Sequence, residues 1–408
     1  MTEEIKRPLK SKRKPNNSKM WDRWLGIGAV VTIVIAWFIG FAQANTDIEP
    51  FLYKAMPEAT RIENINSATY AAYSNNSPEQ LIGYITIGEA NGYGGPMKVA
   101  VGIDPDGNLL GLAVMEQRET PSWFKRVTDS DFIQQLFGKS YTEPFELGND
   151  VDGVTGATYT SRAIAEAVRR GSREIASSQL GLPVPAQTSP PIQFGIPEIV
   201  LIALFAVGYV GHKRGFKYTK QVRWASMLIG MVVLGFIYTA PLTIAYINKF
   251  LLGFWPDWHT HLYWYLLIGG ILFVFTVDNK NPYCSWFCPF GAAQECMGLI
   301  GGAKTRTPKQ YRSLFKWLQR GLAWLAIVVA LIFRNPGLTS YEVFGTLFDL
   351  QGNVIQFALL GLVLLAALFI KRPWCSYLCP LNPIEEFIRM IRGWIKELWL
   401  KVKTEPAG

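Results

Sequence analysis

The chain has 408 residues, of which half are hydrophobic, only 17% are charged and 14 are tryptophans. This composition excludes a single small soluble domain and is typical of a membrane protein with two or three domains. The net charge of +9 does not indicate nucleic-acid binding, because residues 44–190 hold 11 Lys and Arg against 18 Asp and Glu. The positive excess flanks apolar segments instead, which predicts contact with anionic membrane lipid.

The N-terminal region begins with a polar segment, residues 1–23, whose eight Lys and Arg predict a basic cytoplasmic tail. Residues 24–44 follow as an apolar segment long enough to cross a bilayer core of ~30 Å, with flanking help. Ala42-Gln43-Ala44 resembles a signal-peptidase site, so the segment is either a retained transmembrane anchor or a cleaved signal. The length of the apolar run favours the retained anchor.

Residues 45–181 form the only long water-soluble stretch and predict an α+β domain. Alternating apolar and polar residues predict strands at 84–88, 97–103 and 109–115, and residues 104–107 predict a turn. A helix is predicted over 161–176 from its apolar face. The turn before this helix delivers Thr158 to the helix N-terminus, where unpaired N–H groups favour an anion such as phosphate. On the turn alone, Thr155 or Thr158 is more simply interpreted as a helix cap.

The pattern Asp-x-x-Thr-Gly-Ala-Thr resembles the acceptor signature of proteins that carry FMN on a threonine through a phosphoester bond, attached by a dedicated FMN transferase. The resemblance implies covalent FMN on Thr158. It also implies that four residues before the threonine form the recognised turn: Asp152, Thr155, Gly156 and Ala157.

Two further stretches resemble the FMN-binding domain family. They are residues 92–96, Gly-Tyr-Gly-Gly-Pro, and the tripeptide Glu119-Thr120-Pro121. The resemblance implies that Glu119 and Thr120 lie at the flavin. Ser122 departs from the pattern, because that family often has glycine there. Together the three motifs give a match to this family over about residues 68–176.

Residues 182–195 are rich in proline and small polar residues and predict a linker. Residues 196–381 then predict an all-α membrane domain of five helices, which with the anchor gives six transmembrane helices. The apolar runs are 196–210, 224–247, 261–277, 318–333 and 354–370. Residues 382–408 predict an amphipathic helix on the cytoplasmic membrane surface.

The positive charges predict the orientation of these spans in a bacterial inner membrane. The tail, residues 212–223, 278–316 and 371–403 hold 26 Lys and Arg, whereas loops 248–260 and 334–353 hold one each. Both termini are therefore expected in the cytoplasm and the FMN domain in the periplasm. His259 and His261 fall in a tryptophan-rich stretch, where an interfacial role is favoured over a quinone or metal contact.

A cysteine motif occurs twice, as Tyr-Cys-Ser-Trp-Phe-Cys-Pro at 283–289 and Trp-Cys-Ser-Tyr-Leu-Cys-Pro at 374–380. The first cysteines of the two copies are 375 − 284 = 91 residues apart, and a glutamate follows each second cysteine after seven residues. Each motif follows a predicted span. The two span pairs are therefore predicted to be parallel repeats, whose symmetry brings the motifs to one depth.

Cysteines at i and i+4 share one helix face, and iron–sulfur clusters are ligated by four thiolates. We therefore predict one shared [4Fe–4S] cluster bound by Cys284, Cys288, Cys375 and Cys379. The alternatives are a pair of clusters completed by other ligands or a partner, a zinc site with the same thiolates, and buried structural cysteines. The last alternative explains neither the repetition nor the prolines.

An FMN domain joined to both cysteine motifs resembles the NosR/NirI family of membrane flavo-iron–sulfur proteins, which support periplasmic nitrous oxide or nitrite reductases. Such relatives often continue into a cytoplasmic ferredoxin-like domain with further cysteines. No cysteine follows Cys379, so we expect this chain to lack that domain.

The resemblance implies a transmembrane electron carrier, a component of an oxidoreductase system rather than a self-contained enzyme. It would take electrons from a quinol or a cytoplasmic ferredoxin-type donor and supply a periplasmic redox acceptor. A bilayer core of ~30 Å is too wide for one tunnelling step, so we expect a quinol, another cofactor or movement of the FMN domain to bridge it. The alternatives are a flavin-based redox sensor and a maturation factor for a periplasmic metalloenzyme.

Overall fold

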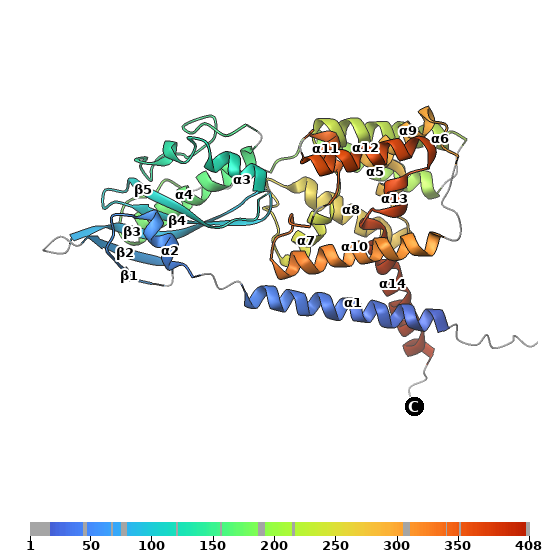
Figure 1. Cartoon of the computed structure of the whole chain (residues 1–408), viewed down its shortest axis with the longest axis horizontal. Helices are drawn as coiled ribbons and strands as arrows, with labels where there is room; N and C mark the ends of the chain where they lie inside the picture. The colour runs from blue at the N-terminus through green and yellow to red at the C-terminus, as the bar shows by residue number, and fades with distance from the viewer. Residues whose placement is uncertain are drawn as a thin grey trace, which may run out of the picture.

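The computed structural model has a sheet-containing part at one end and a helical part at the other (Figure 1). Helix α1 (Asn17–Ala42) runs alongside the helical part. The structure describes residues 17–43, 47–66, 68–74, 80–119, 121–155, 157–186, 192–213, 217–304, 311–339, 341–350 and 352–404.

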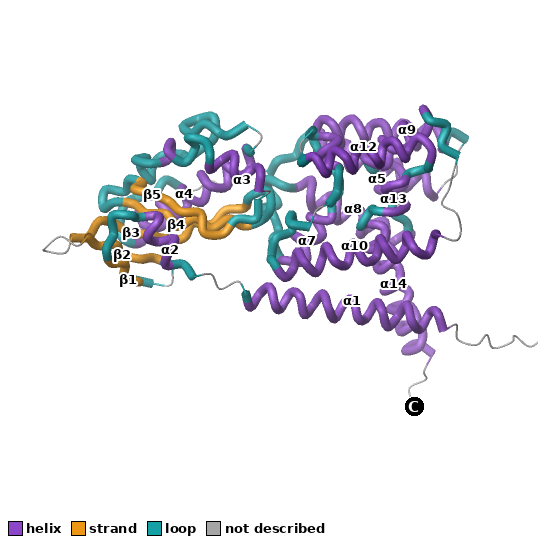
Figure 2. The backbone as a smooth tube through the Cα atoms, viewed as in Figure 1, coloured by secondary structure: helices purple, strands orange, loops and turns teal. Residues whose placement is uncertain are grey.

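The sheet has five antiparallel strands in the order β1-β2-β3-β4-β5 (Figure 2). The strands are β1 (Arg61–Asn64), β2 (Thr69–Ser74), β3 (Gln80–Asn91), β4 (Pro96–Ile103) and β5 (Leu109–Glu116). The three predicted strands lie within β3, β4 and β5, whereas β1 and β2 were not predicted. At the predicted turn, the Asp104 carboxylate accepts hydrogen bonds from the N–H groups of Asp106 and Asn108.

Helix α4 (Thr158–Ser178) covers one face of the sheet, and the shorter α2 (Glu49–Ala55) packs on the other. The close approach of α4 to β3 requires glycine, because a Cβ at Gly88 would lie 2.0 Å from the Ala167 carbonyl oxygen. Helix α3 (Pro121–Thr128) and the short η1 (Gln134–Leu136) complete the described elements of this part. Helix α4 begins at Thr158, three residues before the predicted start.

The helical part contains the remaining elements. They are α5 (Ile196–Lys213), α6 (Thr219–Ile229), η2 (Gly230–Ile237), α7 (Ile244–Leu252), α8 (Leu262–Asp278), η3 (Tyr283–Phe287), α9 (Pro289–Ile300), α10 (Arg312–Ile332), α11 (Phe344–Phe348), α12 (Val354–Phe369), α13 (Pro373–Tyr377) and α14 (Leu381–Thr404). Helix α14 crosses α1 and α10 (Figure 1).

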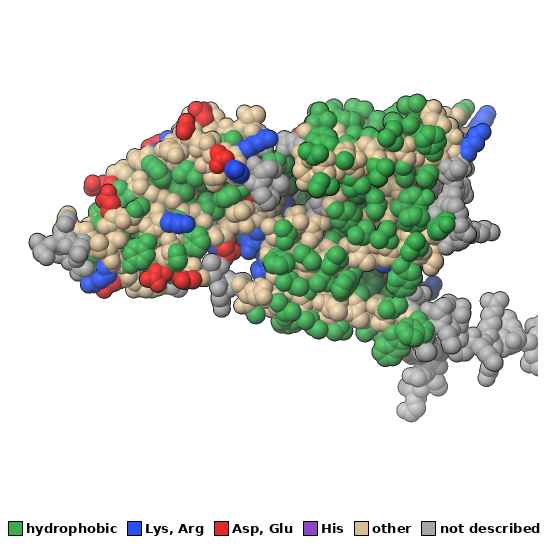
Figure 3. All heavy atoms as spheres, viewed as in Figure 1, with side chains coloured by type: hydrophobic (Ala, Val, Ile, Leu, Met, Phe, Trp, Pro, Cys, Tyr) green, Lys and Arg blue, Asp and Glu red, His purple; other side chains and the backbone are tan. Residues whose placement is uncertain are grey.

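Six apolar helices among the described residues overlap the six predicted spans. Three are long and apolar enough to cross a membrane: Arg23–Ala42, Thr219–Ile237 and Arg312–Ile332. Three are shorter: Ile196–Gly211, Leu262–Asp278 and Val354–Phe369. Apolar side chains cover much of the visible face of the helical part, whereas acidic side chains gather on the sheet-containing part (Figure 3). The helical part therefore suits a lipid environment, and the number of spans stays a prediction.

The predicted span 224–247 is wrong in extent. The helix ends at Ile237 in π-helical geometry, and α7 begins only at Ile244. Two residues after Ile237 prevent the helix from continuing. Thr239 has a positive φ of 46°, and Pro241 has no N–H to donate a helical hydrogen bond. The apolar residues beyond Ile237 therefore form a turn and a separate short helix.

Candidate functional site

Glu119 connects the three motifs of the sheet-containing part. Its side chain is 2% exposed, and one carboxylate oxygen accepts a hydrogen bond of 2.9 Å from the Gly94 N–H. The other oxygen accepts one of 2.7 Å from the hydroxyl of Thr160, in the first turn of α4. The glycine loop, the segment 117–119 and the start of α4 are therefore held together by one buried carboxylate.

The N-terminus of α4 carries Thr158 as its first residue. The residue before it, Ala157, is buried, and no side chain caps the helix. Neither Thr155 nor Thr158 therefore serves as a cap, so the first N–H groups are available to an anion. The side chain of Ser161 supports the turn instead, because it accepts from the Val154 N–H and donates to the Ala157 carbonyl.

The other predicted residues of this site lie in or beside the turn. Thr158, Asp152 and Thr155 are exposed, and the Asp152 N–H donates to the Gln135 side chain. Thr120 and Gly156 lie outside the described residues. The structure thus brings Thr158 and Glu119 to the same helix end.

Aromatic side chains surround this helix end. The ring of Tyr93 lies 5.1 Å from that of Trp123 and 6.1 Å from that of Tyr159, measured between centroids. An exposed threonine, an uncapped helix N-terminus and aromatic faces fit a phosphate-linked flavin.

The four motif cysteines line one cavity of 80 Å³ in the helical part. Cys284 lies in η3, Cys288 is the residue before α9, Cys375 lies in α13 and Cys379 follows it. Among the residues that the structure describes, no group of three or more His, Cys, Asp or Glu was found that would hold a single metal ion.

Hydrogen-bond donors and a positive charge face the cysteine sulfurs. The Asn281 amide donates to Cys284 Sγ at 3.3 Å, and the Gln294 amide donates to Cys375 Sγ at 3.5 Å. Arg372 lines the same cavity. Donors and cations of this kind stabilise thiolate ligands and tune a cluster's potential, so the residues present fit an iron–sulfur cluster.

The internal repeat is also visible in the ion pairs beside the two motifs. Glu295, seven residues after Cys288, pairs with Arg223 of α6 and with Arg372, the residue before α13. Glu386, at the equivalent position of the second copy, pairs with Arg320 and Lys316 of α10. In both copies the glutamate therefore binds an arginine of the first helix in its own span pair.

Several residues of these sites were not predicted. They are Thr160, Ser161, Asn281, Gln294 and Arg372. The repeat offers a signal for three of them, because positions 281 and 372, and likewise 294 and 385, are related by the offset of 91 and each pair lies beside the cysteines. Thr160 carries no such signal, since its role depends on contact with a distant carboxylate.

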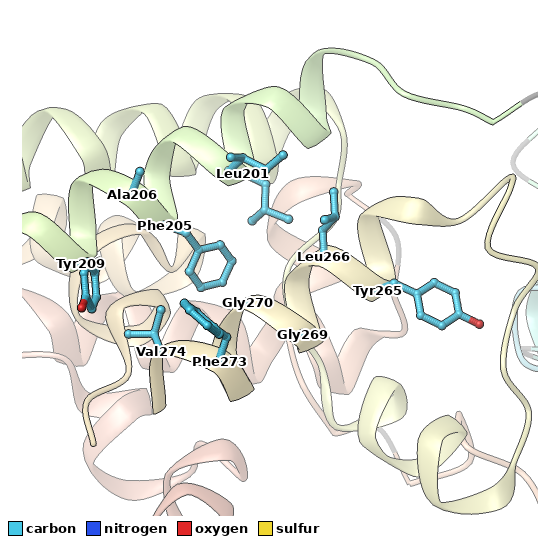
Figure 4. Close-up of a pocket in the computed structure, with 11 residues that line it drawn as sticks. Leu201, Phe205, Ala206, Tyr209, Tyr265, Leu266, Gly269, Gly270, Phe273 and Val274 are labelled. Atoms are coloured by element: carbon cyan, nitrogen blue, oxygen red, sulfur yellow. The ribbon is translucent and has the colours of Figure 1, made fainter. Parts of the chain in front are cut away.

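A second, apolar cavity of 350 Å³ lies between α5 and α8 (Figure 4). Its lining includes Phe205 and Phe273, with Gly269 and Gly270 leaving space between the helices. The histidines of the 257–261 segment have local partners: His259 contacts Asp257, and His261 contacts Thr260.

Two family models match the parts of the chain that contain these two sites. An FMN-binding domain model matches residues 92–172, and a 4Fe–4S binding domain model matches residues 260–308 and 354–399. The chain carries an FMN-binding domain and a 4Fe–4S binding domain. The expected absence of a ferredoxin-like iron–sulfur domain gains no support, because the second model matches both cysteine segments.

Two of three curated relatives of this chain are components of oxidoreductase complexes. Protein NirI of Paracoccus denitrificans is 28% identical over 45% of this chain and 29% of its own length. A component of the proton-translocating ferredoxin:NAD(+) oxidoreductase complex of Clostridium ljungdahlii is 26% identical over 29% of this chain and 66% of its own. A component of the ion-translocating oxidoreductase complex of Vibrio parahaemolyticus is 36% identical over 25% and 51%. The chain spans less than a third of NirI and between half and two thirds of the two complex components. These relatives support a role in electron transfer and a link to NirI-like proteins.

Proposed function

We propose that this protein is a NosR/NirI-like electron carrier of the bacterial inner membrane. It relays electrons between one [4Fe–4S] cluster, bound by Cys284, Cys288, Cys375 and Cys379 on the cytoplasmic side, and FMN linked covalently to Thr158 in the periplasm. The acceptor is a periplasmic redox protein, and the donor is a quinol or a ferredoxin-type protein. An FMN transferase attaches the flavin.

One observation carries this proposal: a single chain combines a flavin-type acceptor turn with a cavity lined by four cysteines. FMN takes up one or two electrons and a cluster takes up one, so the pair suits a relay between unlike partners. Within the chain, Glu119 fixes the start of α4, and Asn281, Gln294 and Arg372 prepare the cavity for thiolate ligands.

The flavin is tested by viewing a denaturing gel of membranes under ultraviolet light, after co-expression with an FMN transferase. Wild type is expected to give a fluorescent band, and Thr158→Ala is expected to give none. Thr142→Ala is the matched control, because it changes an exposed threonine of the same domain that lies outside the recognised turn. A fluorescent Thr158→Ala band would refute the assignment.

The cluster is tested by measuring iron and acid-labile sulfide in the purified protein. Cys284→Ala is expected to lose both. Cys296→Ala is expected to keep both, because Cys296 does not line the cavity. About four iron atoms per chain support one cluster, about eight support two, and zinc in place of iron would refute the relay.

A further inference from the structure

Positive charge is scarce in two loops of the helical part. Loops 248–260 and 334–353 hold one cationic residue each, Lys249 and Arg334. Both residues contact the FMN-binding domain: Lys249 donates to the Tyr93 carbonyl, and the Arg334 carbonyl accepts from Arg118. The two charges that these loops retain therefore both lie where the domains meet.

The first contact is a stack on one aromatic ring. The guanidinium of Arg118 lies 4.6 Å from the centroid of Phe254, and that of Arg334 lies 5.3 Å from the same ring. Arg118 also donates to the Arg334 carbonyl oxygen at 2.6 Å, and its side chain is only 11% exposed. This stack attaches the segment just before Glu119 to the helical part.

The second contact brings a lysine to the flavin loop. Lys249 of α7 lies 5.0 Å from the Tyr93 ring centroid and 6.0 Å from that of Tyr246. Tyr93 lies next to Gly94, and the Gly94 N–H donates to the Glu119 carboxylate. The same carboxylate accepts from the hydroxyl of Thr160, two residues after Thr158. A cation from the helical part therefore enters the aromatic group beside the attachment threonine.

The surroundings leave Lys249 short of negative charge. Loss of water contact lowers its pKa to about 8, and only Glu119 acts in the opposite direction. The other groups that interact with it are aromatic or basic: Tyr93, Tyr246 and His261. An ammonium in this position gains from a further anion nearby.

We propose that Lys249 is a flavin-site residue supplied by the membrane domain, where it faces the flavin on Thr158 and stabilises its reduced form. This inference rests on the attachment proposed above. The oxidised ring is neutral, whereas two electrons and one proton give a reduced ring with one negative charge. An adjacent ammonium therefore favours the reduced ring and raises its potential.

The test is a dithionite titration of the full-length, flavin-loaded protein, followed by visible absorption. Each tenfold loss of preference for reduced flavin lowers a two-electron potential by about 30 mV. We expect Lys249→Met to lower the flavin potential by about this amount and Lys249→Arg to stay near wild type. Lys280→Met is the matched control, because it removes an exposed lysine just after the C-terminal end of α8, whereas the segment that holds Lys249 precedes the N-terminal end of that helix.

Phe254→Ala is a second route to the same result, because it removes the stack without changing charge or the flavin domain. It is expected to lower the potential as Lys249→Met does. A flavin-loaded Lys249→Met protein with an unchanged potential would overturn the inference and leave the proposed function intact. A wild-type protein without a fluorescent band would instead overturn the proposed function.

Discussion

Replacing Glu119 by alanine is expected to separate the three flavin-site segments. The free-energy cost follows from the hydrogen bonds that the carboxylate accepts. Glu119→Ala removes two hydrogen bonds to a buried carboxylate, at 2.9 and 2.7 Å, and leaves the Gly94 N–H and the Thr160 hydroxyl without their acceptor. Hydrogen bonds to charged groups contribute about 1.5–3 kcal/mol each, partly offset because no carboxylate is then buried. We expect a net local destabilisation of about 3 kcal/mol, which is roughly a 100-fold change in the opening equilibrium.

Hydrogen exchange of the full-length protein measures this change directly. In Glu119→Ala the Gly94 amide and the first turn of α4 are expected to exchange roughly 100-fold faster, and less flavin is attached. Glu119→Gln is the matched control: its amide oxygen accepts from Gly94, and its amide group pairs with the Thr160 hydroxyl, so the loss is about 1 kcal/mol. Equal exchange rates in the two variants would refute the reasoning.

Three further predictions concern packing, charge and pH. Gly88→Ala places a Cβ against the backbone of α4 and is expected to destabilise the FMN-binding domain by about 1–3 kcal/mol in thermal unfolding, whereas Gly269→Ala, with open space around it, is tolerated. Glu295→Gln removes the carboxylate shared by two arginines and is expected to cost about 2 kcal/mol and lower the iron content; Glu386→Gln, at a more exposed pair, costs under about 1 kcal/mol. Because the pKa of Lys249 is about 8, the difference in flavin potential between wild type and Lys249→Met is expected to be full below that pH and to disappear above it. Repeating the titration at a series of pH values checks this, and a constant difference would exclude Lys249 as its source.

Much of the flavin domain was predictable from local pattern. Alternation gave β3, β4 and β5, and the acceptor turn placed Thr158 at a helix end, where the structure has it. Strands β1 and β2 were not predicted because both are short: β1 (Arg-Ile-Glu-Asn) has a single apolar residue, and β2 has two alanines at its centre, so neither shows a clear alternation. The link from Glu119 to Thr160 is a contact between residues 41 positions apart, and no local pattern encodes it.

The cysteine site was predictable for a different reason. The repeated motif gave the four cysteines by internal comparison, and the structure places all four on one cavity. The hydrogen-bond donors around them were not predicted, because Asn281 and Gln294 lie outside the seven-residue cysteine motif. Only the offset of 91 residues relates their positions to the second copy. Hydropathy also joined residues 224–247 into one span, since a window average does not detect the turn at Pro241.

The turn at Pro241 changes how the cysteine cavity and the flavin loop are connected. The Leu242 N–H donates to the Tyr283 hydroxyl beside Cys284, so the segment folds inward. The Ile244 N–H, at the start of α7, donates to Glu342, and two residues later Phe344 lines the cysteine cavity.

The other end of this connection is at the flavin. Helix α7 carries Lys249 to the Tyr93 loop, so protein contacts run without a gap from the flavin loop to the cysteine cavity. Contiguous packed protein does not shorten the electron-transfer distance, so a quinol, another cofactor or movement of the FMN-binding domain is still expected to bridge the ~30 Å bilayer core.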